Sequence, residues 1–252
     1  MSLEVRRVTK AFGGFCALDE VSIAVETDAL FGIIGPNGAG KSTLFSVLSG
    51  FMPADAGEIL LDGHSLSRLS PHARARAGMV RTFQVPREFR HLTVRENLMV
   101  AAPGQTGEHL ASLFLRPGQV RREELRIAQQ AEEIIEFLRL TTVAELPSGS
   151  LSGGQKKLLE LGRALMVAPK MLLLDEPFAG VNPVLTGMIV DRIRELNARG
   201  IGFVIIEHEL AALTRLVPRL AVMDRGRIIA SGPPEKVLKD ERVREAYLGA
   251  VT

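Results

Sequence analysis

The residues best suited to chemistry begin with a glycine-rich loop. It fits the pattern G-x-x-x-x-G-K-[ST] without mismatch and consists of Gly35, Pro36, Asn37, Gly38, Ala39, Gly40, Lys41 and Ser42, followed by Thr43. Glycines let backbone amides converge on phosphate oxygens with no Cβ in the way. Lys41 supplies a mobile positive charge for the β- and γ-phosphates, and Ser42 can place its hydroxyl on Mg²⁺. The loop therefore predicts a phosphate site with a magnesium ion.

A pair of carboxylates follows an apolar run further along the chain. Asp175 and Glu176 come directly after Met171–Leu174. Because ligands bind at the carboxyl ends of strands in parallel α/β sheets, Asp175 is placed to bind Mg²⁺. Glu176 is placed to orient or deprotonate a water that attacks the γ-phosphate. Alone, such a pair is equally well explained as a solvated strand end; downstream of a phosphate loop, the functional interpretation is favoured.

A second glycine cluster precedes a helix with an apolar face. It consists of Ser152, Gly153, Gly154 and Gln155, after Leu151. Ser152 and Gln155 have the spacing of a capping box, and two glycines leave the amides of the helix N-terminus open to an anion. Because this second anion site lies more than 100 residues from the first, two chains are expected to share each nucleotide.

The elements that must position these groups follow from hydrophobic patterning. Apolar residues at spacing two in the first 30 residues predict antiparallel strands around a turn at Phe12–Phe15. A buried strand, 30–34, leads into the phosphate loop, and further strands are predicted at 58–61, 79–84, 171–174 and 202–206. The segment from about 86 to 165 is mostly helical, with one amphipathic helix over 122–140. The pattern favours an α/β core with a helical insert.

Composition excludes several classes of protein. The chain has 252 residues, a net charge of +2 and one cysteine, Cys16, which we expect in the core. A single cysteine excludes a disulfide framework and a multi-cysteine zinc site. The near-neutral charge argues against a charge-driven nucleic-acid binder. No apolar stretch approaches the ~18 residues of a membrane span, and the polar N-terminus is unlike a secretory signal, so we expect a cytoplasmic protein.

The ordered set of motifs resembles the ATP-binding subunits of ABC transporters over essentially the whole chain, because LSGGQ is the signature of that family. The resemblance implies that the aromatic ring of Phe12 stacks on adenine, that Gln84 contacts Mg²⁺ and the attacking water, and that His208 contacts the γ-phosphate. The implied catalytic residues are Glu176, His208, Gln84 and Lys41. The implied metal-binding residues are Ser42, Gln84 and Asp175, and the implied ligands are ATP and Mg²⁺.

A finer resemblance points to the branched-chain amino-acid uptake branch. It rests on 81–84, 89–98, 179–183 and the ending Ala246-Tyr247-Leu248-Gly249. Asn182 departs from the general family pattern, which has an aspartate there, so the cross-dimer role of that carboxylate is not transferred.

The resemblance implies a P-loop NTPase core with an N-terminal antiparallel β subdomain and an inserted α-helical subdomain. We expect a single ABC ATPase domain over 1–252, with the core at about 1–85 and 166–252 and the helical subdomain at about 86–165. Two copies would close head to tail on ATP, as a homodimer or heterodimer.

The expected partners are transmembrane permease subunits and, indirectly, a solute-binding protein, which would place the chain on the inner face of the cell membrane. Val85, Phe89 and Leu92 are candidates for a groove that receives a short permease helix; ordinary packing of the insert is the alternative.

Three alternatives remain at this point. The first is a transporter ATPase for a different cargo, such as urea or amides, or lipopolysaccharide moved outward. The second is a soluble nucleic-acid-associated ABC ATPase, although the chain carries a single set of motifs and no sustained heptads in 44–150. The third is a generic P-loop kinase, which leaves LSGGQ unexplained.

Overall fold

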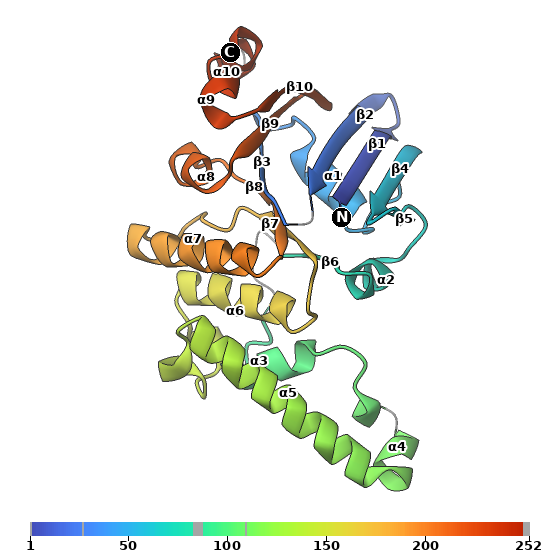
Figure 1. The fold of residues 1–252 in the computed structure, drawn as a ribbon, viewed down its shortest axis with the longest axis vertical. Coiled ribbons are helices and arrows are strands. Elements are labelled where there is room, and N and C mark those ends of the chain that lie inside the picture. Colours follow the sequence, from blue (N-terminus) through green and yellow to red (C-terminus); the bar gives the residue numbers. More distant parts are fainter. Residues whose placement is uncertain (1, 27, 83–87, 109, 249–252) are drawn as a thin grey trace. The chain divides into compact units, whose positions relative to one another are not determined.

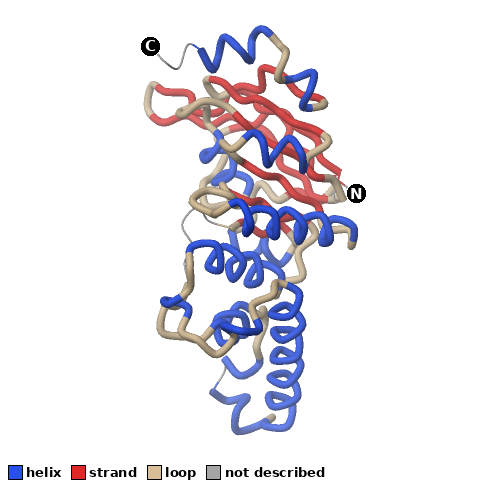
Figure 2. The backbone as a smooth tube through the Cα atoms, turned by 90° about the vertical axis from the view of Figure 1, so that its left-hand side faces the viewer, coloured by secondary structure: helices blue, strands red, loops and turns tan. Residues whose placement is uncertain are grey.

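The structure, a computed structural model, describes residues 2–26, 28–82, 88–108 and 110–248. It divides into two compact units. Unit 1 consists of Met1–Gln84, Pro169–Ala179 and Thr186–Thr252, and unit 2 of Val85–Ala168 and Gly180–Leu185. All the named strands belong to unit 1, whereas the described part of unit 2 is built from helices and loops (Figure 2).

The first strands of unit 1 form an antiparallel sheet, as the alternating pattern predicts. Its order is β2-β1-β4-β5 (Figure 1), with β1 at Ser2–Phe12, β2 at Phe15–Glu26, β4 at Ala56–Leu61 and β5 at His64–Ser65. Phe12 faces Phe15 across the predicted turn. The alternating apolar residues of β1 and β2 are buried, so one face of this sheet contributes to the core.

The second sheet of unit 1 has the order β10-β9-β3-β8-β7-β6. Neighbouring strands from β9 to β6 are parallel, and only the β9–β10 pair is antiparallel. Every residue of β3, β7 and β8 is buried, as expected for parallel strands covered on both faces. The bounds are β3 Leu30–Ile34, β6 Met79–Arg81, β7 Met171–Asp175, β8 Gly202–Ile206, β9 Arg219–Asp224 and β10 Arg227–Gly232.

Helix α1 (Lys41–Leu48) connects the two sheets through its apolar side chains. Leu44, Phe45, Val47 and Leu48 belong to one buried cluster with residues of β1, β3, β7 and β8. The phosphate loop is thereby fixed to a helix that the core holds on several sides. The other helices whose residues lie wholly or mainly in unit 1 are α2 Pro71–Arg76, α7 Pro183–Ala198, α8 Leu210–Leu216, α9 Pro234–Val237 and α10 Glu241–Leu248.

Unit 2 contains α3 (Val94–Ala101), α4 (Leu110–Leu115), α5 (Pro117–Phe137) and α6 (Gly153–Leu165), with 3-10 turns at Thr106–Glu108, Thr141–Val143 and Ser148–Ser150. Helix α5 begins five residues before the predicted start at 122, because Pro117 fits the first turn, where no amide donor is needed. Asn97 is fully buried and bonds both backbone groups of Phe89. This amide therefore holds the segment that enters α3.

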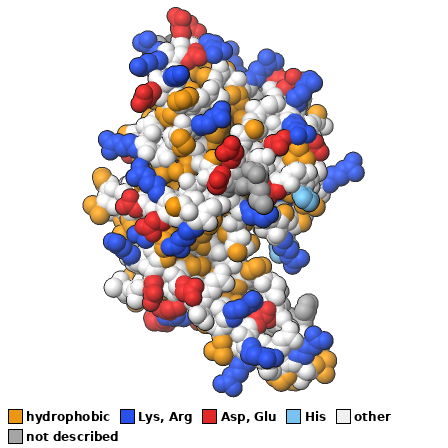
Figure 3. Space-filling model, in the orientation of Figure 1, with side chains coloured by type: hydrophobic (Ala, Val, Ile, Leu, Met, Phe, Trp, Pro, Cys, Tyr) orange, Lys and Arg blue, Asp and Glu red, His pale blue; other side chains and the backbone are white. Residues whose placement is uncertain are grey.

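Cys16 is exposed, not buried, because it lies on an outward position of β2 beside the turn, so the prediction of a core cysteine is wrong. Acidic and basic side chains are interspersed on the face shown in Figure 3. Among the described residues, none of the helices has the length and apolarity to cross a bilayer.

Candidate functional site

The phosphate loop lies between β3 and α1, at the carboxyl end of the parallel sheet. At two of its glycines a side chain would collide with neighbouring backbone. Gly35 has φ +154°, and a Cβ there would lie 2.1 Å from the carbonyl oxygen of Met223. Gly40 has φ +99°, and its Cβ would lie 2.5 Å from the carbonyl oxygen of Ala17. The close packing of neighbouring backbone therefore requires glycine at both positions.

Lys41 turns back over this loop. Its side-chain Nζ donates hydrogen bonds to the carbonyl oxygens of Gly35, at 2.7 Å, and Pro36, at 2.9 Å. Burial lowers the pKa of Lys41, whereas the carboxylates of Glu176 and Asp175 act in the opposite direction. A buried ammonium held by two carbonyls is well suited to exchange those partners for phosphate oxygens.

Three neighbouring strand ends surround one cleft. The loop follows β3, His208 follows β8 and the acid pair ends β7, and these strands are adjacent in the order β3-β8-β7. The cleft has a volume of about 410 Å³ and is lined by Phe15, Ala17, Asn37, Gly38, Ala39, Gly40, Lys41, Ser42, Thr43, Glu176 and His208. The sequence-predicted groups from three distant segments are thus brought together.

The acid pair differs in environment between its two members. Asp175 is 4% exposed, and a carboxylate oxygen lies 2.8 Å from a guanidinium nitrogen of Arg81. Glu176 is directed to the cleft, where its Oε1 lies 3.2 Å from Nε2 of His208. The backbone of Glu176 has φ +50°, a left-handed conformation that is unfavourable for a residue with a Cβ.

The donor set around the loop is compatible with Mg²⁺. Asp175 offers a carboxylate and Ser42 a hydroxyl, while the described residues contain no group of three or more acidic, histidine or cysteine side chains arranged for a metal. Mg²⁺ is usually held by one or two carboxylates together with waters and substrate phosphates, not by an all-protein cage. A sparse donor set beside a phosphate loop therefore fits this ion.

The second glycine cluster starts α6 in unit 2. Ser152 and Gln155 form the predicted capping box, in which each side chain bonds the other's backbone amide. Gly153 is exposed, and a Cβ there would meet only the carbonyl oxygen of Gly180, at 3.9 Å. Asn182 caps the start of α7 by accepting a hydrogen bond from the amide of Leu185. Gly154 is buried against Leu185, so the α6 N-terminus is open at Gly153, where it has the geometry of an anion site.

The predicted adenine-stacking residue is Phe12, and a predicted magnesium ligand is Gln84. Phe15, not Phe12, lines the cleft, while the Lys10 ammonium lies 5.6 Å from the centroid of the Phe12 ring. Gln84 and Val85 lie outside the described residues. In the described part of the predicted groove, Phe89 is 48% exposed and the guanidinium carbon of Arg163 lies 5.1 Å from its ring centroid.

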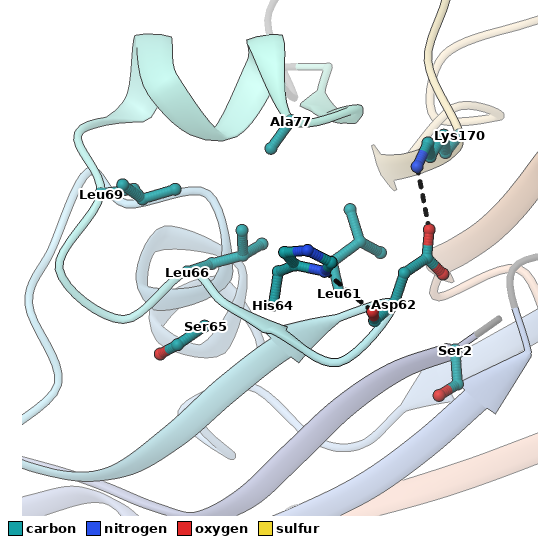
Figure 4. A pocket seen from close by; sticks show the side chains of 9 residues that line it. All are labelled: Ser2, Leu61, Asp62, His64, Ser65, Leu66, Leu69, Ala77 and Lys170. Carbon is teal, nitrogen blue, oxygen red and sulfur yellow. Dashed lines mark hydrogen bonds and ion pairs between the residues drawn. The ribbon is translucent and has the colours of Figure 1, made fainter.

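A larger concavity, of about 860 Å³, lies elsewhere in unit 1 and contains none of the predicted site residues. Figure 4 shows it bordered by Leu66, Leu69 and Ala77 on one side and by the Lys170–Asp62 ion pair on the other. It lacks a glycine-rich loop or an open helix N-terminus. The chemistry therefore favours the smaller cleft as the phosphate site.

Two residues that contribute to the site are absent from the sequence-based set. Arg81 contacts Asp175, and Glu207 is an acid 2% exposed at the end of β8. A charged residue at the carboxyl end of a strand beside the phosphate-loop strand is the signal that points to Glu207.

Comparisons with known proteins point to one family. The family model "ABC transporter" matches residues 18–179, and the model "Branched-chain amino acid ATP-binding cassette transporter" matches residues 227–251. A probable branched-chain amino acid transport ATP-binding protein, LivG, from Archaeoglobus fulgidus is 41% identical, over 98% of this chain and 95% of that protein.

A second relative has a different cargo, and a solved structure matches the fold. The lipopolysaccharide export ATP-binding protein LptB from Haemophilus influenzae is 36% identical, over 98% of this chain and 97% of its own. The crystal structure of the ADP conformation of an ATP-binding cassette from an ABC transporter has a TM-score of 0.84 and 40% identity, covering 99% of both chains.

Proposed function

The chain belongs to the ATP-binding subunits of ABC transporters, and on that premise we propose that it hydrolyses ATP to drive an importer of branched-chain amino acids. The identity of the cargo is inferred from the match of residues 227–251 to the branched-chain family model, together with 41% identity to a LivG protein over nearly the whole chain. As a member of this family the chain is an ATPase.

The cleft supports a role for each part of the loop. The amides of 35–43 and the N-terminus of α1 would hold the phosphates, and Lys41 would exchange its two carbonyl partners for phosphate oxygens. Phe15 lines the cleft and is 61% exposed, which makes it as suitable as Phe12 for stacking on the base.

Hydrolysis requires a water placed in line with the γ-phosphate. Glu176 would accept hydrogen bonds from that water and take its proton, while His208, 3.2 Å from Glu176, would contact the γ-phosphate. Gln84 is retained as a further candidate from the family resemblance.

Ser42 and Asp175 would hold Mg²⁺, together with Gln84 by resemblance. The ion would supply positive charge that offsets the negative charge of the phosphate oxygens. The carboxylate of Asp175 would then contact both the ion and Arg81, whose guanidinium nitrogen lies 2.8 Å from one of its oxygens.

A second chain would complete each site. In this proposal Ser152, Gly153, Gly154 and Gln155 of one copy bind the γ-phosphate held by the loop of another, because the open α6 N-terminus lacks an anion of its own chain. The γ-phosphate would stabilise the closed dimer, and its loss would favour opening. The permease would contact the predicted groove around Phe89, which is 48% exposed, and this contact would hold the ATPase at the inner face of the membrane.

The experiment reconstitutes the ATPase with its permease subunits in vesicles. A leucine-loaded binding protein is expected to stimulate ATP hydrolysis and ATP-dependent leucine uptake. Stimulation by lipopolysaccharide without leucine uptake would instead support the export function that the relationship to LptB favours. Absence of ATP hydrolysis by the wild-type complex would contradict the proposal as a whole.

A further inference from the structure

Glu207 is a buried acid between the end of β8 and His208. It is 2% exposed, and carboxylates are seldom buried so completely unless they are hydrogen-bonded. Its Oε1 accepts a hydrogen bond from the amide of Phe178 at 2.7 Å. Its Oε2 accepts two more, from the amides of His208 at 3.0 Å and Glu209 at 3.3 Å. One side chain thus satisfies three backbone donors.

These hydrogen bonds join two segments that are 29 residues apart in sequence. Phe178 lies two residues after Glu176, and His208 directly follows Glu207. The same carboxylate therefore fixes the backbone beside both members of the Glu176–His208 pair. Glu207 itself is not among the residues that line the cleft.

The backbone of Glu176 needs this support. Its left-handed φ of +50° is unfavourable for a residue with a side chain, and such conformations persist only where the surroundings enforce them. The segment is held on entry by the hydrogen bond from the amide of Glu176 to the carbonyl of Ile206, at 2.9 Å. It is held on exit by the hydrogen bond from Phe178 to Glu207.

We propose that Glu207 is a positioning residue for ATP hydrolysis: its carboxylate holds the Glu176 segment and the His208 segment in register. The inference rests on the ATPase function proposed above and deepens it. Without the exit hydrogen bond, Glu176 relaxes from its left-handed conformation, and the attacking water loses its orientation. Nucleotide binding is preserved, because the phosphate loop does not depend on these bonds.

The test is Glu207→Gln in the full chain. Glutamine keeps the volume but offers one oxygen and one NH₂ donor, so it cannot accept from both segments. We expect kcat for ATP to fall roughly 10- to 100-fold, the range for small misplacements of reacting groups. The dissociation constant of a fluorescent ATP analogue should stay at the wild-type value. The matched control is Glu209→Gln, which removes the same charge from an exposed side chain of the same loop and should retain wild-type kcat.

Each outcome is decisive. Wild-type kcat in Glu207→Gln overturns the inference and leaves the proposed function intact. Equal losses of kcat and nucleotide affinity assign Glu207 a purely structural role and also overturn it. If Glu207→Gln does not fold, Glu207→Asp replaces it, because aspartate keeps both oxygens but shortens their reach, and the same split between kcat and affinity is expected. A wild-type chain with no ATPase activity overturns the proposed function, and this inference with it.

Discussion

A guanidinium nitrogen of Arg81 lies 2.8 Å from a carboxylate oxygen of Asp175, and the two side chains are only 10% and 5% exposed. Arg81 also donates a hydrogen bond to the hydroxyl of Ser46, at 3.1 Å, and its guanidinium carbon lies 5.7 Å from the ring centroid of Phe45. Arg81 thus joins the strand that leads to Gln84, the helix behind the phosphate loop and the proposed magnesium ligand. In a nucleotide-free chain it neutralises the charge that Mg²⁺ would otherwise meet.

The first prediction concerns Arg81→Met, which keeps the length of the side chain and removes its charge. Removing one partner of a buried ion pair costs about 3–5 kcal/mol, so Tm without nucleotide should fall. Mg²⁺ at Asp175 would restore the missing positive charge. The rise in Tm on adding Mg–ATP should therefore be larger than in the wild type.

Thermal unfolding with ATP and EDTA, and with ATP and Mg²⁺, measures this difference. Arg227→Met is the control, because Arg227 forms an exposed ion pair with Asp19 and such pairs contribute little. An equal rise in Tm in Arg81→Met and wild type would show that Asp175 does not bind the ion.

The second prediction concerns Glu176→Gln, which removes the base but preserves the shape of the side chain. The chain should bind ATP with wild-type affinity and hydrolyse it at least about 100-fold more slowly, within the usual range for loss of a general base. Because the γ-phosphate then persists, the closed dimer should accumulate. Gel filtration at high concentration with Mg–ATP checks this, and a monomer peak under those conditions would contradict the shared site.

Sequence patterns predicted the fold in those segments whose residues are compatible with few local structures. Alternating apolar residues predicted β1 and β2, and the pattern of the loop 35–42 predicted a strand before it and a helix after it. The turn at Gly13–Gly14 was also predicted, because glycine readily adopts the positive φ that Gly13 has there. Cys16, beside that turn, was misplaced because the alternation of buried residues in β2 is broken between Leu18 and Val21 and does not extend to the turn.

The supporting residues of the site could not be predicted in the same way. Arg81 and Asp175 are 94 residues apart, and Glu207 and Phe178 are 29 apart. Their interactions depend on the strand order β3-β8-β7-β6, which local patterns do not contain. The same holds for Phe15, which lines the cleft although Phe12 matched the family position.

The third prediction tests whether two chains share a nucleotide. Gly153→Asp should fold normally, because a Cβ at Gly153 meets only one atom, at 3.9 Å, and an acid in the first turn is favourable for a helix. Its charge should repel the γ-phosphate of the partner's nucleotide and abolish hydrolysis. Lys41→Ala should abolish hydrolysis by weakening the phosphate loop.

Mixing the two inactive variants should restore activity. A mixed dimer contains one site with an intact loop from the Gly153→Asp chain and an intact α6 N-terminus from the Lys41→Ala chain. Recovery of ATPase activity on mixing is the expected result. If each nucleotide were bound within one chain, every site would carry a defect and the mixture would stay inactive.

The last prediction concerns the pH dependence of stability. Burial raises the pKa of Glu207 above its ordinary value of 4.5, although the amides of Phe178, Glu209 and His208 oppose this, and the nearby carboxylate of Glu176 adds to the rise. Between the unfolded and folded pKa values, the folded chain binds more protons than the unfolded chain. The stabilisation from Glu207 is therefore complete below the unfolded pKa and is lost as the pH rises through the folded pKa.

The wild type should consequently lose stability relative to Glu207→Gln as the pH rises from below 4.5 towards neutrality. Urea unfolding of both proteins at a series of pH values gives the difference in their free energies of unfolding. The contributions of the other titrating groups largely cancel in this difference, because both proteins contain them. A constant difference would mean that the three amides balance burial. A difference that grew in favour of the wild type would mean that they outweigh it, with Glu207 more easily ionised in the folded chain.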